Sequence, residues 1–157
     1  FGVQGVVLHL TTYVLATVGI FVALAYMVGH GVDTDLDSIR ELWRKMPVVS
    51  ASLVVLVLSL IGMPPLLGFW SKFLYLFIAP VQFAPWLTLI AILNTGISIG
   101  YYGQIIRYMF LTKQESAASE PTEKIRDPQV LVVLLCAVLT MLLGLVLGPT
   151  FGSVLRV

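Results

Sequence analysis

Charged residues are scarce in this chain of 157 residues. Lys and Arg number 9, Asp and Glu number 8, and together they make up 11% of the chain, against about 25% in soluble globular domains. Hydrophobic residues account for 59%, and the mean hydropathy is +1.00. This composition excludes an ordinary soluble domain and predicts an integral membrane protein. The formal net charge of +1 gives no reason to expect a nucleic-acid partner.

Cysteine is almost absent as well. Cys136 is the only one and lies in the apolar run 130–148, so an intramolecular disulfide is excluded and no second cysteine is available as a metal ligand. The sequence also lacks a nucleotide-binding loop, a metal cluster and a nucleophile motif. We therefore expect no catalytic residue, no metal and no cofactor bound by this chain itself, and we expect Cys136 to be a small core or lipid-facing residue.

An initiating Met and a basic leader segment are both missing, because the chain begins at Phe1 inside an apolar run. We therefore expect a C-terminal part of a longer chain. The alternating pattern of a membrane β-barrel is missing too, and backbone groups in lipid must be satisfied within the segment. The fold class predicted is an all-α polytopic membrane helix bundle of about four passes, at 3–28, 47–79, 86–111 and 128–148, the last closed by Gly148 and Pro149.

The second pass is interrupted by a double proline in the stretch "SLIGMPPLLGFWSKF" (59–73). Pro64 and Pro65 remove backbone donors and restrict the preceding residues, so they should break the helix between Gly62 and Gly68. The segment 47–79 is then either one broken pass or a hairpin of two short crossings. The basic residues lie in loops 29–46 and 112–127, and the positive-inside rule favours one broken pass with both loops cytoplasmic.

Lys72 is the strongest candidate for chemistry, because it follows this break by a few residues. A lysine at mid-membrane costs about 2.5 to 3.5 kcal/mol on insertion scales, so it usually faces a bundle interior or a hydrated cavity. There, desolvation and water access would allow a lysine to load and release a proton. The alternative is a lysine near the interface that snorkels to lipid headgroups.

His9 is a second candidate for proton transfer, because imidazole takes either protonation state near neutral pH. A neutral histidine bonded to a neighbouring helix is the alternative. Hydroxyl and amide side chains on the predicted passes are candidates for a polar path that holds water, although each singly can equally bond within or between helices. These candidates are Tyr13, Ser59, Ser71, Asn94 and Ser98.

Two motifs carry a resemblance to a known family. "LSLIGMPPLLGFWSKF" (58–73) resembles a signature of the N subunit of respiratory complex I, an antiporter-like proton-translocating membrane subunit. "LNTGISIGYYGQIIRYMF" (93–110) resembles the asparagine- and serine-containing helix of that family, although Gly103 and Gln104 here follow the tyrosine pair. His9 has no counterpart in the family pattern.

The resemblance implies that 47–79 is the broken helix and that Lys72 is the key lysine of a proton half-channel. It also implies a subunit of NADH:quinone oxidoreductase in a prokaryotic cell membrane, or alternatively in a mitochondrial inner or thylakoid membrane. NADH, flavin, iron–sulfur clusters and quinone would lie elsewhere in the complex, and the partners would be lipid and other membrane subunits, including neighbouring antiporter-like ones. The alternatives are a subunit of a cation/proton antiporter or membrane-bound hydrogenase, and a structural subunit that pumps nothing.

Overall fold

Every regular element in the described part of the chain is a helix. The computed structural model describes residues 2–33, 35, 39–40, 42–73, 79–81, 83–111 and 123–154. Its helices are α1 (Gly2–Gly29), α3 (Leu42–Lys45), α4 (Pro47–Ile61), α5 (Leu67–Trp70), α6 (Ala79–Val81), α7 (Pro85–Leu111) and α8 (Pro128–Val154). Three of them, α1, α7 and α8, are long and apolar enough to cross a membrane, and α4 is a shorter apolar helix. The predicted all-α membrane helix bundle is confirmed.

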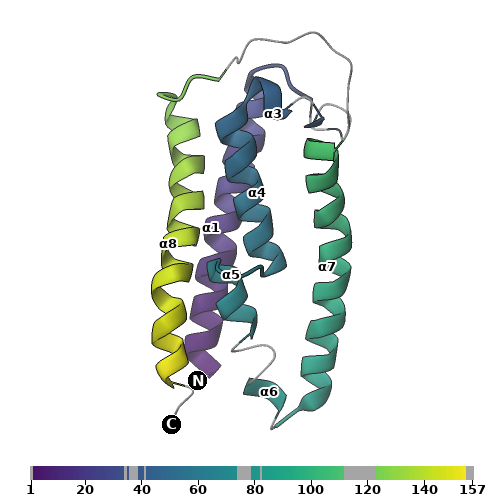
Figure 1. The fold of residues 1–157 in the computed structure, drawn as a ribbon, viewed down its shortest axis with the longest axis vertical. Helices are drawn as coiled ribbons and strands as arrows, with labels where there is room; N and C mark the ends of the chain where they lie inside the picture. The colour runs from purple at the N-terminus through teal and green to yellow at the C-terminus, as the bar shows by residue number, and fades with distance from the viewer. Residues whose placement is uncertain are drawn as a thin grey trace.

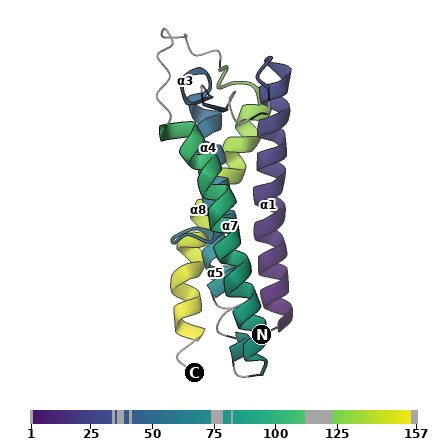
Figure 2. The ribbon, with the colours of Figure 1, turned by 90° about the vertical axis from the view of Figure 1, so that its right-hand side faces the viewer.

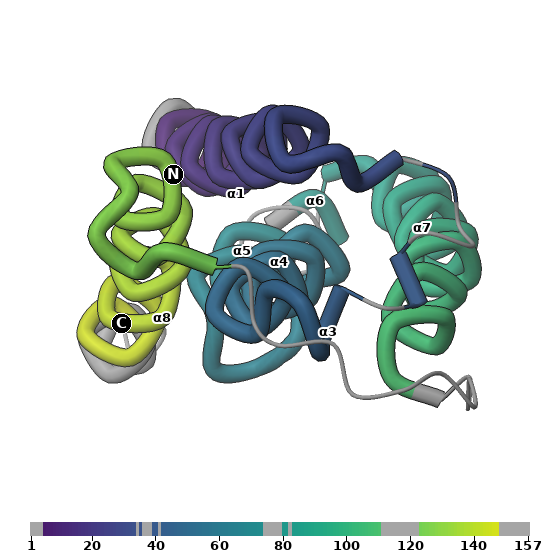
Figure 3. The backbone as a smooth tube through the Cα atoms, turned by 90° about the horizontal axis from the view of Figure 1, so that it is seen from above, coloured from purple at the N-terminus to yellow at the C-terminus, as the bar shows by residue number. Residues whose placement is uncertain are grey.

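The interrupted segment α4–α5 lies at the centre of the bundle (Figures 1 and 3). Helices α1 and α8 pack on it and on each other, while α7, in front in Figure 2, forms a separate column that contacts α4. Gly19 of α1 permits close packing, because a β-carbon there would lie 3.0 Å from Cβ of Cys136 and 2.5 Å from a methyl of Leu56. Cys136 is buried, as expected for a small core residue.

The predicted helix break begins with a glycine cap. Gly62 follows α4 with φ +92°, a left-handed conformation that glycine adopts without steric cost. The amides of Gly62 and Met63 both donate to the carbonyl of Leu58, at 3.0 Å each. These bonds satisfy one of the last carbonyls of α4 and end the helix at Ile61.

The two prolines lie in the turn between the helix ends. Pro64 and Pro65 are both exposed and both outside α4 and α5, as predicted from their missing backbone donors. The interruption is shorter than expected at its second end, however. Helix α5 begins at Leu67, so Gly68 lies inside α5 instead of closing the break. The reason is that nothing after Pro65 prevents a helix from starting, and Gly68 is needed for a close contact described below.

After the break the chain continues in the same direction along the bundle, so α4 and α5 do not form a hairpin (Figure 1). Helix α1 ends, and α4 and α8 begin, at the end of the bundle where α3 lies, which is called the α3 end below. The basic residues of 40–45 and of 124–126 therefore share that end. The spans themselves, and the side of the membrane that each loop faces, stay predictions.

The last helix differs from expectation at its C-terminal end. Helix α8 continues through Gly148 and Pro149 to Val154, whereas the apolar stretch able to span a membrane ends at Leu147, next to the predicted end of the pass. A proline removes one backbone donor, yet membrane helices tolerate this loss when neighbouring groups re-satisfy the freed carbonyl. The 20 residues from Pro128 to Leu147 are the part of α8 that is apolar enough to span a membrane.

Candidate functional site

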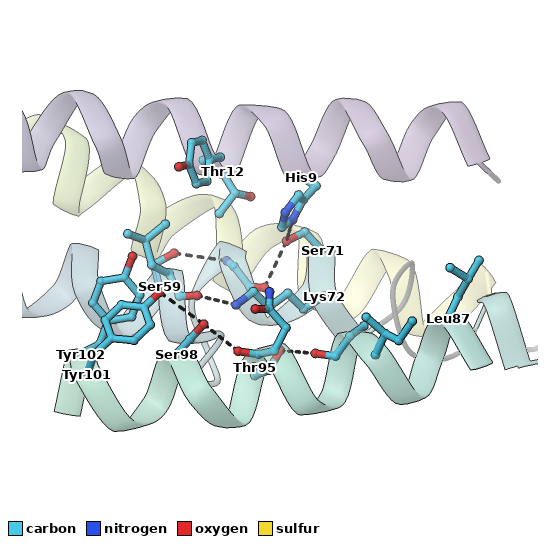
Figure 4. Close-up of a pocket in the computed structure, with 16 residues that line it drawn as sticks. His9, Thr12, Ser59, Ser71, Lys72, Leu87, Thr95, Ser98, Tyr101 and Tyr102 are labelled. Atoms are coloured by element: carbon cyan, nitrogen blue, oxygen red, sulfur yellow. Dashed lines mark hydrogen bonds between the residues drawn. The ribbon is translucent and has the colours of Figure 1, made fainter. Parts of the chain in front are cut away.

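A cavity of about 460 Å³ lies between α1, the α4–α5 segment and α7 (Figure 4). It brings together residues that are up to about 90 positions apart in the sequence. Tyr13, which lines the cavity, has 54% of its surface exposed, so the cavity reaches the surface of the chain there. All the sequence candidates for proton transfer and for the polar path line it: His9, Tyr13, Ser59, Ser71, Lys72, Asn94 and Ser98.

The residues of the predicted helix break contribute unequally to this cavity. Gly68 lines it, whereas Gly62, Pro64 and Pro65 do not. The prolines therefore affect the site by interrupting the helix between α4 and α5, and they are not part of the cavity wall. The break begins at Gly62, as predicted, and the polar groups near it come from the helix ends on either side.

Lys72 is bonded to the C-terminal end of α4. Its Nζ donates to the carbonyl of Leu60 at 2.5 Å and to that of Ile61 at 3.3 Å. The last carbonyls of a helix have no partner within the helix and carry the negative end of its dipole, so an ammonium group suits them. The half-buried lysine therefore has two backbone acceptors in this structure, and the broken helix itself supplies both.

A glycine and a serine hold the two halves of the broken helix against each other. The amide of Gly68 donates to Oγ of Ser59 at 3.3 Å, and Ser59 is fully buried. A β-carbon on Gly68 would collide with the carbonyl oxygen of Ser59, so only glycine fits at this contact. This close approach places the next turn of chain, with Lys72, beside the carbonyls at the end of α4.

His9 reaches the site through a serine. The hydroxyl of Ser71 donates to the carbonyl of Gly68 at 3.1 Å, which leaves its oxygen as acceptor for Nδ1 of His9 at 3.3 Å. In this arrangement Nδ1 carries a proton. Figure 4 shows His9 entering from α1, with Ser71 between it and the α4–α5 segment. The histidine is thus connected to the break by one hydroxyl group.

Helix α7 supplies the wall of the cavity opposite α1. Asn94, Ser98, Tyr101 and Tyr102 follow the spacing i, i+4, i+7 and i+8, which is one face of a helix. The hydroxyl of Ser98 donates to the carbonyl of Asn94 at 2.9 Å, and that of Tyr101 donates to Oγ of Ser98 at 3.4 Å. Sequence reasoning did not select the two tyrosines, and their helical spacing from Asn94 is the signal that assigns them to the cavity.

Toward the α3 end the polar cavity gives way to an apolar one. This second cavity, of about 250 Å³, is lined by aliphatic side chains and Met from α1, α4 and α7, together with Ile39 and Leu42. Tyr102 lines both cavities. Apolar cavities tend to stay dry, whereas polar ones of sufficient size hold water. Tyr102 therefore marks a boundary between space suited to water and space that is not.

No acidic residue is among the side chains that line the polar cavity in the described part of the chain. The polar groups that line it with Lys72 are hydroxyls, an amide and the imidazole of His9, and the rest of the lining includes aliphatic side chains.

A glycine on α8, which the sequence did not single out, allows close packing behind the helix break. A β-carbon on Gly144 of α8 would collide with the carbonyl of Pro65 and with backbone atoms of Leu66 and Leu67, so this glycine lets the interruption lie directly against α8.

Comparison with known proteins places the chain among membrane subunits. Residues 1–98 match the model of a family described as "NADH:quinone oxidoreductase/Mrp antiporter, TM". NADH-quinone oxidoreductase subunit N 2 of Acidobacterium capsulatum is 37% identical over 143 residues, which are 87% of this chain and 28% of that protein.

Two further relatives match almost the whole chain. Subunit N of Chloroflexus aggregans is 29% identical over 99% of the chain, and subunit N 1 of Roseiflexus castenholzii is 31% identical over 98%. The matches cover 31% and 28% of those proteins. The chain thus spans less than a third of the length of these relatives, all of which are bacterial, in agreement with an integral protein of a prokaryotic membrane.

Proposed function

Because the chain belongs to the NADH:quinone oxidoreductase/Mrp antiporter transmembrane family, we propose that it forms part of a proton-translocating membrane subunit of an NADH:quinone oxidoreductase. In this proposal Lys72 is the titratable group of a proton half-channel. The observation that carries the proposal is the position of the Lys72 ammonium, which is bonded to the carbonyls of Leu60 and Ile61 and lies in a polar cavity of about 460 Å³.

The geometry supports a lysine that exchanges a proton with water in this cavity. A cavity of that volume has room for on the order of ten waters, at about 30 Å³ each. Protonated Lys72 is held by the end of α4 through charge-assisted bonds. A neutral amine keeps two protons but loses the charge–dipole attraction, so release of a proton also weakens the bonds between the side chain and the helix end. Binding by α4 and proton loss are thus coupled.

The two cavities favour a path that is open on one side of the lysine only. The polar cavity offers hydroxyls and an amide beside Lys72, while the aliphatic cavity beyond Tyr102 opposes entry of water from the α3 end. The basic residues predict that the α3 end is cytoplasmic. The half-channel would therefore open away from the cytoplasm.

The remaining parts of the proposal concern the rest of the complex. The named relatives are subunits of an NADH-quinone oxidoreductase, so the partners we propose are other membrane subunits, including neighbouring antiporter-like ones. Electron transfer from NADH through flavin and iron–sulfur clusters to quinone would occur in other subunits, and this chain would contribute proton movement. A carboxylate able to pair with Lys72 would come from outside the described residues.

The test is to compare Lys72→Ala with Lys72→Arg in the full-length subunit within the assembled complex. Arginine keeps a cation for the carbonyls of α4, but it does not release a proton in proteins. We expect both variants to assemble and reduce quinone, and both to move fewer protons per electron in proteoliposomes. Arg126→Ala, which removes an exposed cation at the α3 end, should leave that ratio unchanged.

The outcomes separate the proposal from its alternatives. A normal proton-to-electron ratio in Lys72→Ala would remove Lys72 from the proton path. Normal pumping in Lys72→Arg but not in Lys72→Ala would assign the lysine a structural role as a cap of α4. Proton flux that depends on sodium, without quinone reductase activity, would instead select a cation/proton antiporter, a class included in the name of the matching family.

A further inference from the structure

The N-terminal end of α4 is capped by an acidic residue that lies 74 and 75 positions away in the sequence. Oε2 of Glu123 accepts the amide of Val48, and Oε1 accepts that of Val49, each at 2.9 Å. Met46, the residue before α4, makes no side-chain cap, and Pro47 has no N–H. Val48 and Val49 are therefore the first free donors of α4, and one carboxylate binds both of them.

The same short segment is tied to α1. The amide of Lys124 donates to the hydroxyl of Tyr26 at 3.3 Å, and Tyr26 is fully buried near the end of α1. The ring of Tyr26 also contacts His30, at 4.1 Å between centroids. Residues 123–124, which precede α8, thus bind the end of α1 and the start of α4 together at the α3 end.

Helix α4 connects this contact to the lysine site. Its first amides are bonded to Glu123, and its last carbonyls are bonded to Lys72. It has 15 residues, which corresponds to about 22 Å. Because the hydrogen-bonded helix is stiff along its axis, a displacement at its first turn moves the carbonyls of Leu60 and Ile61 as well. The link that α4 provides between Glu123 and Lys72 is this mechanical one, along the helix axis.

We propose that Glu123 is a positioning residue of the Lys72 site: by binding the first turn of α4, it fixes where the carbonyls that hold Lys72 lie. The consequence for proton transfer rests on the proposed function, whereas the consequence for the position of α4 does not. With α4 fixed at its far end, release of the lysine moves the side chain into the cavity while the helix stays in place.

The chain offers a matched control for this proposal. Oδ1 of Asp127 accepts the amide of Gln129 at 3.0 Å, at the start of α8. It is a carboxylate at a helix N-terminus, four residues after Glu123, but its helix supplies no hydrogen bond to Lys72 in the described structure. Glu123→Gln and Asp127→Asn each replace a capping carboxylate with an amide of the same shape, but Asp127 caps its own helix locally, whereas Glu123 joins two segments that are distant in the sequence.

Two measurements on the full-length subunit in the assembled complex test the proposal. The first is the distance between spin labels at position 51 on α4 and position 138 on α8, both exposed here. We expect a shifted or broadened distance distribution in Glu123→Gln and no change in Asp127→Asn. The second is proton flux per electron, which we expect to fall roughly 2- to 30-fold in Glu123→Gln only, the range seen for residues that modulate coupling from a distance.

Glu123→Asp keeps the carboxylate and should restore most of both signals, which also covers the case in which Glu123→Gln assembles poorly. An unchanged label distance in Glu123→Gln would overturn the proposal, as would equal changes in Glu123→Gln and Asp127→Asn. If Lys72→Ala abolishes pumping, a shifted label distance with normal proton flux in Glu123→Gln would overturn the link between Glu123 and Lys72. If Lys72→Ala pumps normally, the proposed function fails, and the label distance alone still decides whether Glu123 fixes α4.

Discussion

The two ends of α4 are held by the same chemistry with opposite sign. At its start, two amides donate to one carboxylate, that of Glu123; at its end, two carbonyls accept from one ammonium, that of Lys72. Each ion satisfies backbone groups that the helix leaves unpaired, and each matches the sign of the helix dipole at that end. By hydrogen bonding alone the two residues would be judged equivalent.

The surroundings of the two ions distinguish them. Lys72 borders an open cavity of about 460 Å³ with hydroxyls, an amide and an imidazole, whereas the space near the α3 end is an aliphatic cavity of about 250 Å³ that Glu123 does not line. The comparison therefore teaches that capping bonds place both charges at the ends of α4, while only the charge of Lys72 has a polar cavity beside it.

The largest effect is expected from a side chain added at the close contact between α4 and α5, because this contact places Lys72 beside the end of α4. In Gly68→Ala, the added β-carbon would collide with the carbonyl of Ser59, a backbone atom that cannot rotate away. We expect a cost at the upper end of the roughly 1–3 kcal/mol of overpacking, seen as a large loss of assembled complex on native gels. Gly96→Ala is the control, because nothing lies within 4 Å of its added carbon. Equal assembly of the two variants would contradict the contact.

A smaller effect is expected from the glycine that ends α4. Gly62 has φ +92°, so Gly62→Ala should cost about 1–2 kcal/mol for the left-handed conformation. Its β-carbon would also lie 3.1 Å from Cδ of Lys72 and would shift the lysine stem. Gly31→Ala is the matched control, since Gly31 has φ +73° with nothing within 4 Å.

Thermal melting of the complex and proton flux per electron separate the two consequences of this change. Both glycine variants should lower the melting temperature by similar amounts, because both place alanine in the left-handed region. Only Gly62→Ala should also lower the proton flux per electron, because only its added β-carbon would meet the side chain of Lys72. A reduced flux in Gly31→Ala would show that flux follows general stability and not the lysine's position.

Local sequence signals predicted much of this arrangement. Apolar runs predicted the ends of α1 and α7 to within a residue or two, because a membrane helix must be apolar over its length. Pro64 and Pro65 predicted the interruption, and the polar residues of the predicted passes do line one cavity with Lys72. Helical periodicity applied to α7 would have added Tyr101 and Tyr102.

The remaining features depend on contacts between distant segments, which no local pattern encodes. Gly144 looks like any glycine of an apolar helix until the chain near Pro65 is placed against it. Glu123 lies among other charged and polar linker residues, and only the fold brings it to the first turn of α4. The helix α8 also runs on past the predicted end of the last pass, because Pro149 would stop a helix in water but is tolerated in membrane helices.

The smallest effect contrasts two buried serines near the two ends of α4. Ser59 accepts the amide of Gly68 across the break, so Ser59→Ala should cost about 1 kcal/mol for a lost bond to another segment. Ser50 donates to the carbonyl of Met46 one turn earlier, and Ser50→Ala should cost less, because such local bonding to the helix backbone stabilises little. Melting of the assembled complex should rank the variants in this order. Equal melting temperatures would mean that the bond across the break adds nothing to the joining of the two halves.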